Sequence, residues 1–131
     1  MEKIVDILNN LPMPKHAYGH VEDSQINAAE KKLNLSFAND YREFVQYLGA
    51  LAYKNYELCG IVPYPSLDVV SCTLRARESD AAFPQSMYVI SELHIDGILI
   101  LQNQKGEIFR YLPLQYTKKI FHSLSDFILS L

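Results

Sequence analysis

The sequence contains no tryptophan, only two cysteines and no long apolar run. Cys59 and Cys72 have neither the spacing of a metal site nor that of a redox CxxC motif, and both lie among apolar neighbours, which predicts small buried thiols. No apolar stretch approaches the roughly 20 residues of a membrane-spanning helix. The first eleven residues, which include Glu2 and Asp6, do not resemble a secretion signal. We therefore expect a cytoplasmic protein with reduced thiols and no membrane segment.

The chain also carries little net charge. Its formal charge of −3 does not identify a partner by itself. Residues 56–96 hold six acidic residues against Arg75 and Arg77, whereas residues 1–55 balance at −1 and residues 97–131 at +2. A basic face for nucleic acid is therefore not supported, and we expect no direct nucleic-acid partner. The acidic middle segment either attracts a basic protein or is an ordinary solvated face.

At 131 residues the chain has the length of one domain, and we predict a single domain over residues 1–131. Folding at this size buries roughly two-thirds of the unfolded surface, so neither a metal nor a disulfide is required. Nine tyrosines and six phenylalanines supply large side chains. Tyrosine is common at protein interfaces because its ring buries area while its hydroxyl stays wet, but most of these rings are expected to fill the core.

Apolar residues at helical spacing predict five helices. They cover residues 4–11, 24–33, 40–48, about 66–79 and 124–131. Asn34 is suited to a left-handed helix stop, and Gly49 ends the third helix. Residues 15–22 are predicted to be a linker, and the short connection after Asn34 predicts that the second and third helices lie close together.

Runs of β-branched and aromatic residues predict the strands. They are Tyr56–Val62, interrupted at Gly60, then Met87–Leu93, Gly97–Gln102 and Glu107–Leu112, with a short edge strand at Lys118–Phe121. Tight turns at 96–97 and 103–106 make successive strands antiparallel. The fold class is therefore α+β: a mostly antiparallel β-meander sheet packed with N-terminal helices and a short C-terminal helix. Residues 98–101 are apolar on both faces and predict a central strand, with helices 26–33 and 41–48 covering one face of the sheet.

No arrangement of catalytic residues is evident in the sequence. His16 and His20 are spaced for a metal only if their segment is helical, and Pro14 and Gly19 argue against a helix there. No nucleophile motif, phosphate loop or Cys/His cluster accompanies them. We therefore expect a protein that is not an enzyme and binds no metal or cofactor. Glu30, beside the inner face of its helix, is either a functional carboxylate or a structural one bonded to a neighbouring loop.

Several short motifs occur in a recognisable order along the chain. They are Ile26, Ala29, Glu30 and Leu33, then Tyr41, Phe44, Val45 and Gly49, then Leu58-Cys59-Gly60-Ile61, Tyr88-Val89-Ile90, Asp96-Gly97 and Gly106-Glu107-Ile108-Phe109, and finally Ser123, Phe127, Ile128 and Leu131. Together they resemble the SUKH superfamily of Smi/Knr-type proteins over residues 26–131. The chain departs from the pattern at Phe37-Ala38, where many members have a proline.

The resemblance implies a function as well as a fold. Bacterial single-domain members are mostly immunity proteins against nuclease or deaminase toxins of polymorphic toxin systems, whereas fungal members belong to cell-wall signalling. It therefore implies a non-catalytic immunity protein that binds and neutralises a cognate toxin domain, expected to be basic. The alternative is a general interaction or regulatory module of the Smi/Knr type with no toxin partner. Its oligomeric state is left open.

The expected partner-binding residues are the carboxylates of the acidic middle segment. They are Glu57, Glu78, Asp80, Glu92 and Asp96. The predicted elements place them near strand ends and loops, where a rigid sheet can position binding groups. A nuclease presents cationic residues where it holds phosphates, so carboxylates could replace the charge of its substrate. The alternative is that these residues are dispersed solubilising charges.

Overall fold

The computed structural model describes residues 3–12, 15–95, 97–113 and 115–131. Its helices are α1 (Ile4–Asn9), α2 (Asp23–Leu33), α3 (Asn39–Leu48), α4 (Val69–Ser79) and α5 (Leu124–Leu129). Its strands are β1 (Lys15–Ala17), β2 (Leu51–Tyr53), β3 (Tyr56–Leu58), β4 (Met87–Glu92), β5 (Leu99–Asn103), β6 (Ile108–Leu112) and β7 (Tyr116–Phe121). The strands form two antiparallel sheets with the helices packed around them, so the predicted α+β class is confirmed.

The larger sheet is the predicted meander. Its strand order is β4-β5-β6-β7, and each neighbouring pair is antiparallel. Leu101 on β5 lies opposite both Val89 on β4 and Phe109 on β6. Ile100 and Leu101 point to opposite faces of the sheet, and both are buried. The central position of this strand is therefore confirmed. The predicted edge strand is also present, although it begins two residues earlier, as β7.

A second, three-stranded sheet was not predicted. β1, β2 and β3 pair in that order, all antiparallel, and each has only three residues. Part of the expected linker 15–22 is thus a strand, and the strand expected at Tyr56–Val62 ends at Leu58. Gly60, where the sequence predicted an interruption, forms a single parallel bridge with Asp68. Strands of three residues are too short to show a period, and the β2–β3 turn uses Lys54 in a left-handed conformation instead of a glycine.

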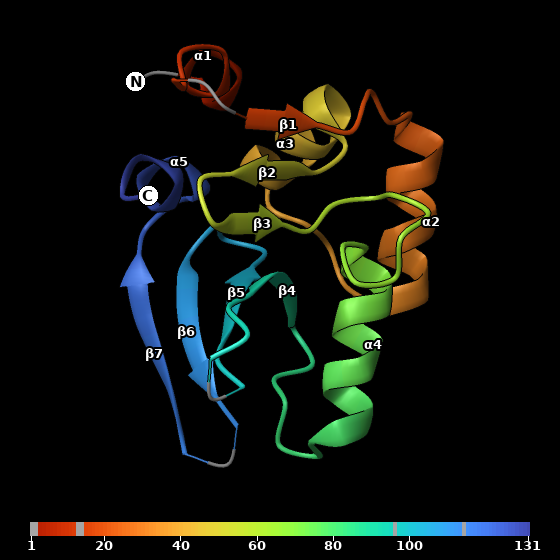
Figure 1. Ribbon diagram of the computed structural model, residues 1–131. Coiled ribbons are helices and arrows are strands. Elements are labelled where there is room, and N and C mark those ends of the chain that lie inside the picture. The colour runs from red at the N-terminus through yellow and green to blue at the C-terminus, as the bar shows by residue number, and fades with distance from the viewer. Residues whose placement is uncertain (1–2, 13–14, 96, 114) are drawn as a thin grey trace.

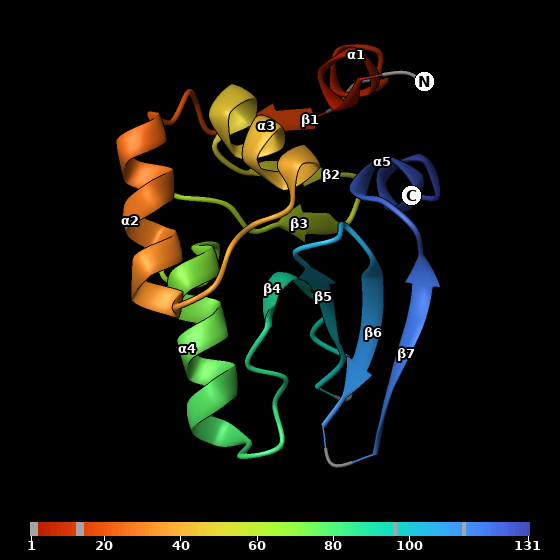
Figure 2. The same cartoon turned by 180° about the vertical axis from the view of Figure 1, so that it is seen from behind.

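Helix packing differs from the prediction in one respect. α4 lies against β4, and α2 packs on α4, so α2 reaches the larger sheet mainly through another helix (Figure 1). The Thr73 hydroxyl of α4 accepts a hydrogen bond of 3.0 Å from the Val89 amide of β4. α3 does contact α2, as expected, and also α1 and α5, which lie side by side at the opposite end of the molecule (Figure 2).

Two glycines allow a close crossing of the backbone beside the smaller sheet. Gly49 ends α3 with φ of 76°, a left-handed conformation that favours glycine. The amide of Ile61 donates to the Gly49 carbonyl at 3.0 Å. A β-carbon added at Gly60 would overlap that same carbonyl oxygen. Position 60 therefore has room only for glycine, because any larger residue would collide with the Gly49 backbone. The sequence had predicted only that the strand is interrupted there.

A buried polar network joins α3, the meander and α5. The Tyr88 hydroxyl accepts from the Ala38 amide at 2.9 Å and donates to Gln102 Oε1 at 2.8 Å. Gln102 Nε2 donates to Asp40 Oδ1 at 3.0 Å, and Asp40 Oδ2 accepts from the Leu124 amide at 2.9 Å. Burial raises the pKa of Tyr88 well above its ordinary value, so this hydroxyl stays protonated and can donate. The network fixes the entry of α3 and the start of α5 relative to the sheet.

Candidate partner-binding surface

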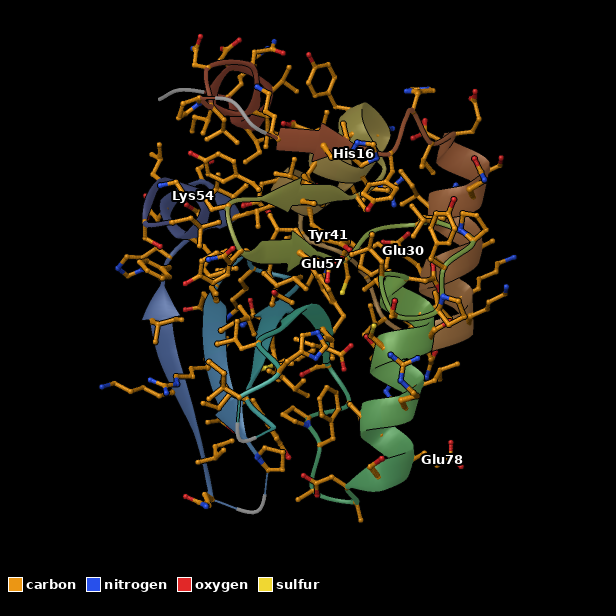
Figure 3. All side chains as sticks on the ribbon, viewed as in Figure 1. His16, Glu30, Tyr41, Lys54, Glu57 and Glu78 are labelled. Atoms are coloured by element: carbon orange, nitrogen blue, oxygen red, sulfur yellow. The ribbon has the colours of Figure 1, made fainter. Side chains whose placement is uncertain are left out.

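The five predicted binding residues do not form one patch. Glu57 is exposed in the middle of β3, and Glu78 is exposed in the last turn of α4. Figure 3 shows these two side chains far apart, with Glu57 near the smaller sheet and Glu78 near the far end of α4. The sequence had placed both residues near strand ends and loops, but Glu57 lies within a strand and Glu78 within a helix. Asp96 lies outside the described residues.

Asp80 is buried and bonded within the fold. It follows the last residue of α4, and one carboxylate oxygen accepts from the Tyr111 hydroxyl while the other accepts from the Ala82 amide at 2.9 Å. Burial and the bond to Asp80 raise the pKa of Tyr111 to about 12. Asp80 therefore ties the end of α4 to β6, and its charge is largely engaged inside the protein.

Glu92 is the candidate carboxylate that combines partial exposure with an ion pair to α4. It ends β4, and its side chain remains partly exposed. Arg75 of α4 lies 3.4 Å from Glu92 Oε1, and the Cys72 sulfur lies 3.4 Å from the same oxygen. Because Arg75 is itself about half exposed, this ion pair is open to water and to a competing cation.

Glu92 and Asp80 line the same groove between α4 and the meander, which we call the α4 groove. Its volume is about 330 Å³. Its walls are formed by Cys72, Arg75, Ala76, Ser79, Asp80, Phe83, Glu92, Gly97, Leu99 and Pro113. The lining combines apolar carbon from Phe83 and Leu99 with two carboxylates. Such a groove can hold the aliphatic stem of a lysine or arginine while a carboxylate meets its charged head.

The comparisons with known proteins bear on the whole chain. The SUKH family described as "SMI1-KNR4 cell-wall" matches residues 1–131. The chain belongs to the SUKH family. Its fold is similar to the crystal structure of a protein from Pseudomonas syringae pv. tomato, with a TM-score of 0.73 and 14% sequence identity. That match covers 98% of this chain and 94% of the other, and at this identity it shows the fold alone. No curated protein matches the chain.

The residues that suggested the SUKH resemblance serve the fold. Glu30 Oε2 accepts from the Phe37 amide at 2.8 Å, and Glu30 Oε1 accepts from Arg42 at 2.8 Å. The sequence allowed either a functional or a structural role for Glu30. These two bonds support the structural role, because they fix the loop between α2 and α3. Asn34 ends α2 with φ of 53°, as predicted. The Tyr41 hydroxyl donates to the Cys59 carbonyl at 2.6 Å.

The histidine pair of the sequence is not arranged as a ligand pair. His16 lies on β1 and stacks edge-on against Tyr18, with ring centroids 4.6 Å apart, while His20 follows the strand. His20 approaches Glu22 at 3.9 Å, with both side chains exposed. Within the described residues, no three His, Cys, Asp or Glu side chains are grouped so that they could hold a metal ion. Across the same residues, no helix is long and apolar enough to cross a membrane.

Two further surfaces of this SUKH protein were not predicted from the sequence. A cleft of about 820 Å³ has a mainly uncharged polar lining and lies between the α2–α3 loop and the β5–β6 turn. Its lining is Asn34, Leu35, Ser36, Gln85, Ser86, Asn103, Gln104 and Lys105. Beside the smaller sheet, Tyr64 is 55% exposed and its ring lies 6.1 Å from that of Tyr18. The amide-rich segments and the tyrosine count were visible in the sequence, but nothing in it showed which of these residues meet in space.

Proposed function

We propose that this protein is a non-catalytic immunity protein that binds and neutralises a cognate toxin domain in the cytoplasm. The observation that carries the proposal is the family match over residues 1–131, because SUKH is a family of immunity proteins in polymorphic toxin systems. SUKH proteins are generally non-catalytic and generally have a toxin partner. The two cysteines are free and buried, which is typical of a reducing compartment. A continuous hydrophobic core supports the single-domain prediction for residues 1–131.

The proposed partner is a basic toxin domain, such as a nuclease or deaminase, and the proposed contact surface includes the α4 groove. Glu92 provides a partly exposed carboxylate there. A standard interface needs about 800 Å² on each partner, so the groove would form only its centre. Glu57 and Glu78 would lie toward opposite edges, where they speed association more than they add affinity.

Co-expression tests this proposal directly. The toxin domain encoded beside this gene is produced with and without the protein, and both growth and complex formation are measured. We expect restored growth and a stoichiometric complex on size-exclusion chromatography. A toxin that remains fully active, with no complex detected at micromolar concentrations of both proteins, would contradict the immunity role.

A second candidate function is supported by the description of the matching family, which refers to SMI1-KNR4 and the cell wall. In that case the protein is a general interaction or regulatory module without a toxin. The gene neighbourhood separates the two candidates. A large upstream gene that ends in a nuclease-like or deaminase-like domain supports immunity, and an operon of metabolic or cell-wall genes supports regulation.

A further inference from the structure

Two thiols meet beneath the α4 groove. Cys59, just after β3, and Cys72, in the first turns of α4, have sulfur atoms 3.8 Å apart, and both side chains are buried. They come from segments separated by 13 positions in the chain. A disulfide needs a sulfur separation of about 2.05 Å, so the two sulfurs must approach by less than 2 Å. The sequence spacing had suggested only two separate buried hydrophobic side chains.

The surroundings of the two sulfurs differ. Cys72 lines the α4 groove, whereas Cys59 does not. Arg75 Nη2 lies 3.3 Å from the Cys72 sulfur, and Glu92 Oε1 lies 3.4 Å from it on the acidic side. The remaining polar neighbours of Cys72 are the carbonyls of Pro65 and Ser66, each at 3.6 Å. A small oxidant entering the groove would therefore meet Cys72 first.

Cys59 is suited to the second step. Its hydrogen bond with Cys72, together with burial, raises its pKa well above the ordinary thiol value, so it remains a protonated thiol. A protonated thiol is a poor first nucleophile towards a peroxide. It is nevertheless held in contact with the sulfur that oxidation would make electrophilic.

We propose that Cys59 and Cys72 form a reversible disulfide when the protein meets hydrogen peroxide. Cys72, as its thiolate, attacks one peroxide oxygen; the O–O bond breaks, and the departing hydroxide takes the proton released by the thiol and becomes water. Cys72 is then a sulfenic acid. The Cys59 sulfur attacks the Cys72 sulfur, the S–O bond breaks, and hydroxide leaves with the Cys59 proton as a second water. Two thiols are oxidised, and one peroxide is reduced to two waters. This inference does not depend on the proposed toxin partner.

The disulfide would join the segment after β3 to α4 and close a loop of 13 positions. Because a cross-link restricts the unfolded chain, we expect the oxidised protein to melt on the order of 5 °C higher than the reduced protein. Oxidation would also remove the Cys72 hydrogen from its contact with Glu92, leaving that carboxylate paired with Arg75 alone.

The test uses the full chain, reduced and then freed of reductant. Hydrogen peroxide is added in small molar excess, and intact mass, free thiols after denaturation and the peptide map are recorded. We expect a monomer lighter by two hydrogen atoms, with no free thiol, a Cys59–Cys72 linked peptide, and full reversal by dithiothreitol. Two free thiols remaining under conditions that oxidise a model dithiol would overturn the proposal, as would products that are only oxygen-adducted or only intermolecularly linked.

Two variants assign the order of the steps. With Cys59→Ala, Cys72 should be trapped as a sulfenic acid by dimedone, because no second thiol is present to resolve it. With Cys72→Ala, Cys59 should react at least tenfold more slowly than Cys72 does in the other variant. If either variant fails to fold, the oxidation of the wild-type protein by hydrogen peroxide still tests whether the disulfide forms. Equal reactivity of the two cysteines in folded variants would overturn the assigned order.

Discussion

Two polar clusters in this protein have opposite character. In the buried network of Asp40, Tyr88 and Gln102, successive hydrogen bonds connect α3, β4, β5 and α5 within the interior. In the α4 groove, Glu92 and Arg75 meet at 3.4 Å, and Arg75 is the exposed partner, with 47% of its side chain in water against 25% for Glu92. The first cluster is bonded within the fold and fixes its elements relative to one another, while the second can exchange an internal contact for an external one. The difference separates the groups that hold the fold from those available for binding.

The strongest way to break the buried network is Tyr88→Phe. The change removes one hydroxyl and leaves the Ala38 amide and Gln102 Oε1 without their partner in the interior. We expect the free energy of unfolding to fall by about 2–4 kcal/mol. Urea unfolding followed by circular dichroism measures it. Tyr64→Phe is the matched control, since Tyr64 is 55% exposed, and its effect should stay within about 0.5 kcal/mol. Equal effects of the two changes would contradict the distinction between the clusters.

Tyr111→Phe tests whether Asp80, which lines the α4 groove, stabilises the fold through its bond to Tyr111. The change removes the hydroxyl that donates to buried Asp80, and we expect a loss of about 1–2 kcal/mol of stability at neutral pH. The Ala82 amide still satisfies one oxygen of Asp80, which limits the effect. Asp80→Asn should cost a similar amount. If both variants are as stable as the wild type, Asp80 is not structural and returns to the set of candidate binding residues.

The same tyrosine predicts a pH dependence. The pKa of Tyr111 is raised from an ordinary value of about 10 to about 12 in the folded protein. A raised pKa means that folding favours the protonated form, so its contribution is fully present below about pH 10 and is lost as the pH rises towards 12. Stability should therefore fall less steeply over this range in Tyr111→Phe than in the wild type. Parallel curves of unfolding free energy against pH would contradict the linkage.

The open cluster of Glu92 and Arg75 is tested together with Asp96, the candidate carboxylate that lies outside the described residues, by the double change Glu92→Lys and Asp96→Lys. If the proposed toxin binds at the α4 groove, the association rate should fall about tenfold at low salt, and the difference should shrink as salt is added. Stability should change by less than about 1 kcal/mol. The control is Asp6→Lys with Glu43→Lys, which alters net charge equally at two exposed positions elsewhere. Stopped-flow binding that shows the same slowing for both pairs would indicate a general charge effect and no site at the groove.

The sequence was sufficient for the elements with long, regular patterns. The meander was predicted because its strands are runs rich in β-branched and aromatic residues and the turns between them contain glycine at Gly97 and Gly106. The smaller sheet was missed because three-residue strands carry no period and depend on pairing across the fold.

Side-chain environments were harder to predict than elements. All five candidate binding carboxylates looked equivalent in the sequence, because burial depends on partners far along the chain. Asp80 is engaged by Tyr111, which lies 31 positions later, and only the folded chain brings the two together. The contact between Cys59 and Cys72 likewise requires the β3–α4 connection to return across the start of the helix.

The last prediction compares a mostly buried ion pair, Arg42 with Glu30, with a more exposed one, Arg75 with Glu92. Arg42 lies 2.8 Å from Glu30, both side chains are about three-quarters buried, and Glu30 also accepts from the backbone. Arg75 is 47% exposed and lies 3.4 Å from Glu92.

We expect Arg42→Met to lower the free energy of unfolding by about 1–2 kcal/mol, because it leaves a partly buried carboxylate without its cation. Arg75→Met should stay within about 0.5 kcal/mol, since water can replace the guanidinium and the methionine stem preserves the packing. Thermal and urea unfolding of the two variants side by side measures the difference. A larger loss for Arg75→Met would mean that Glu92 and Arg75 belong to the scaffold, and a partner could then not use Glu92 without destabilising α4.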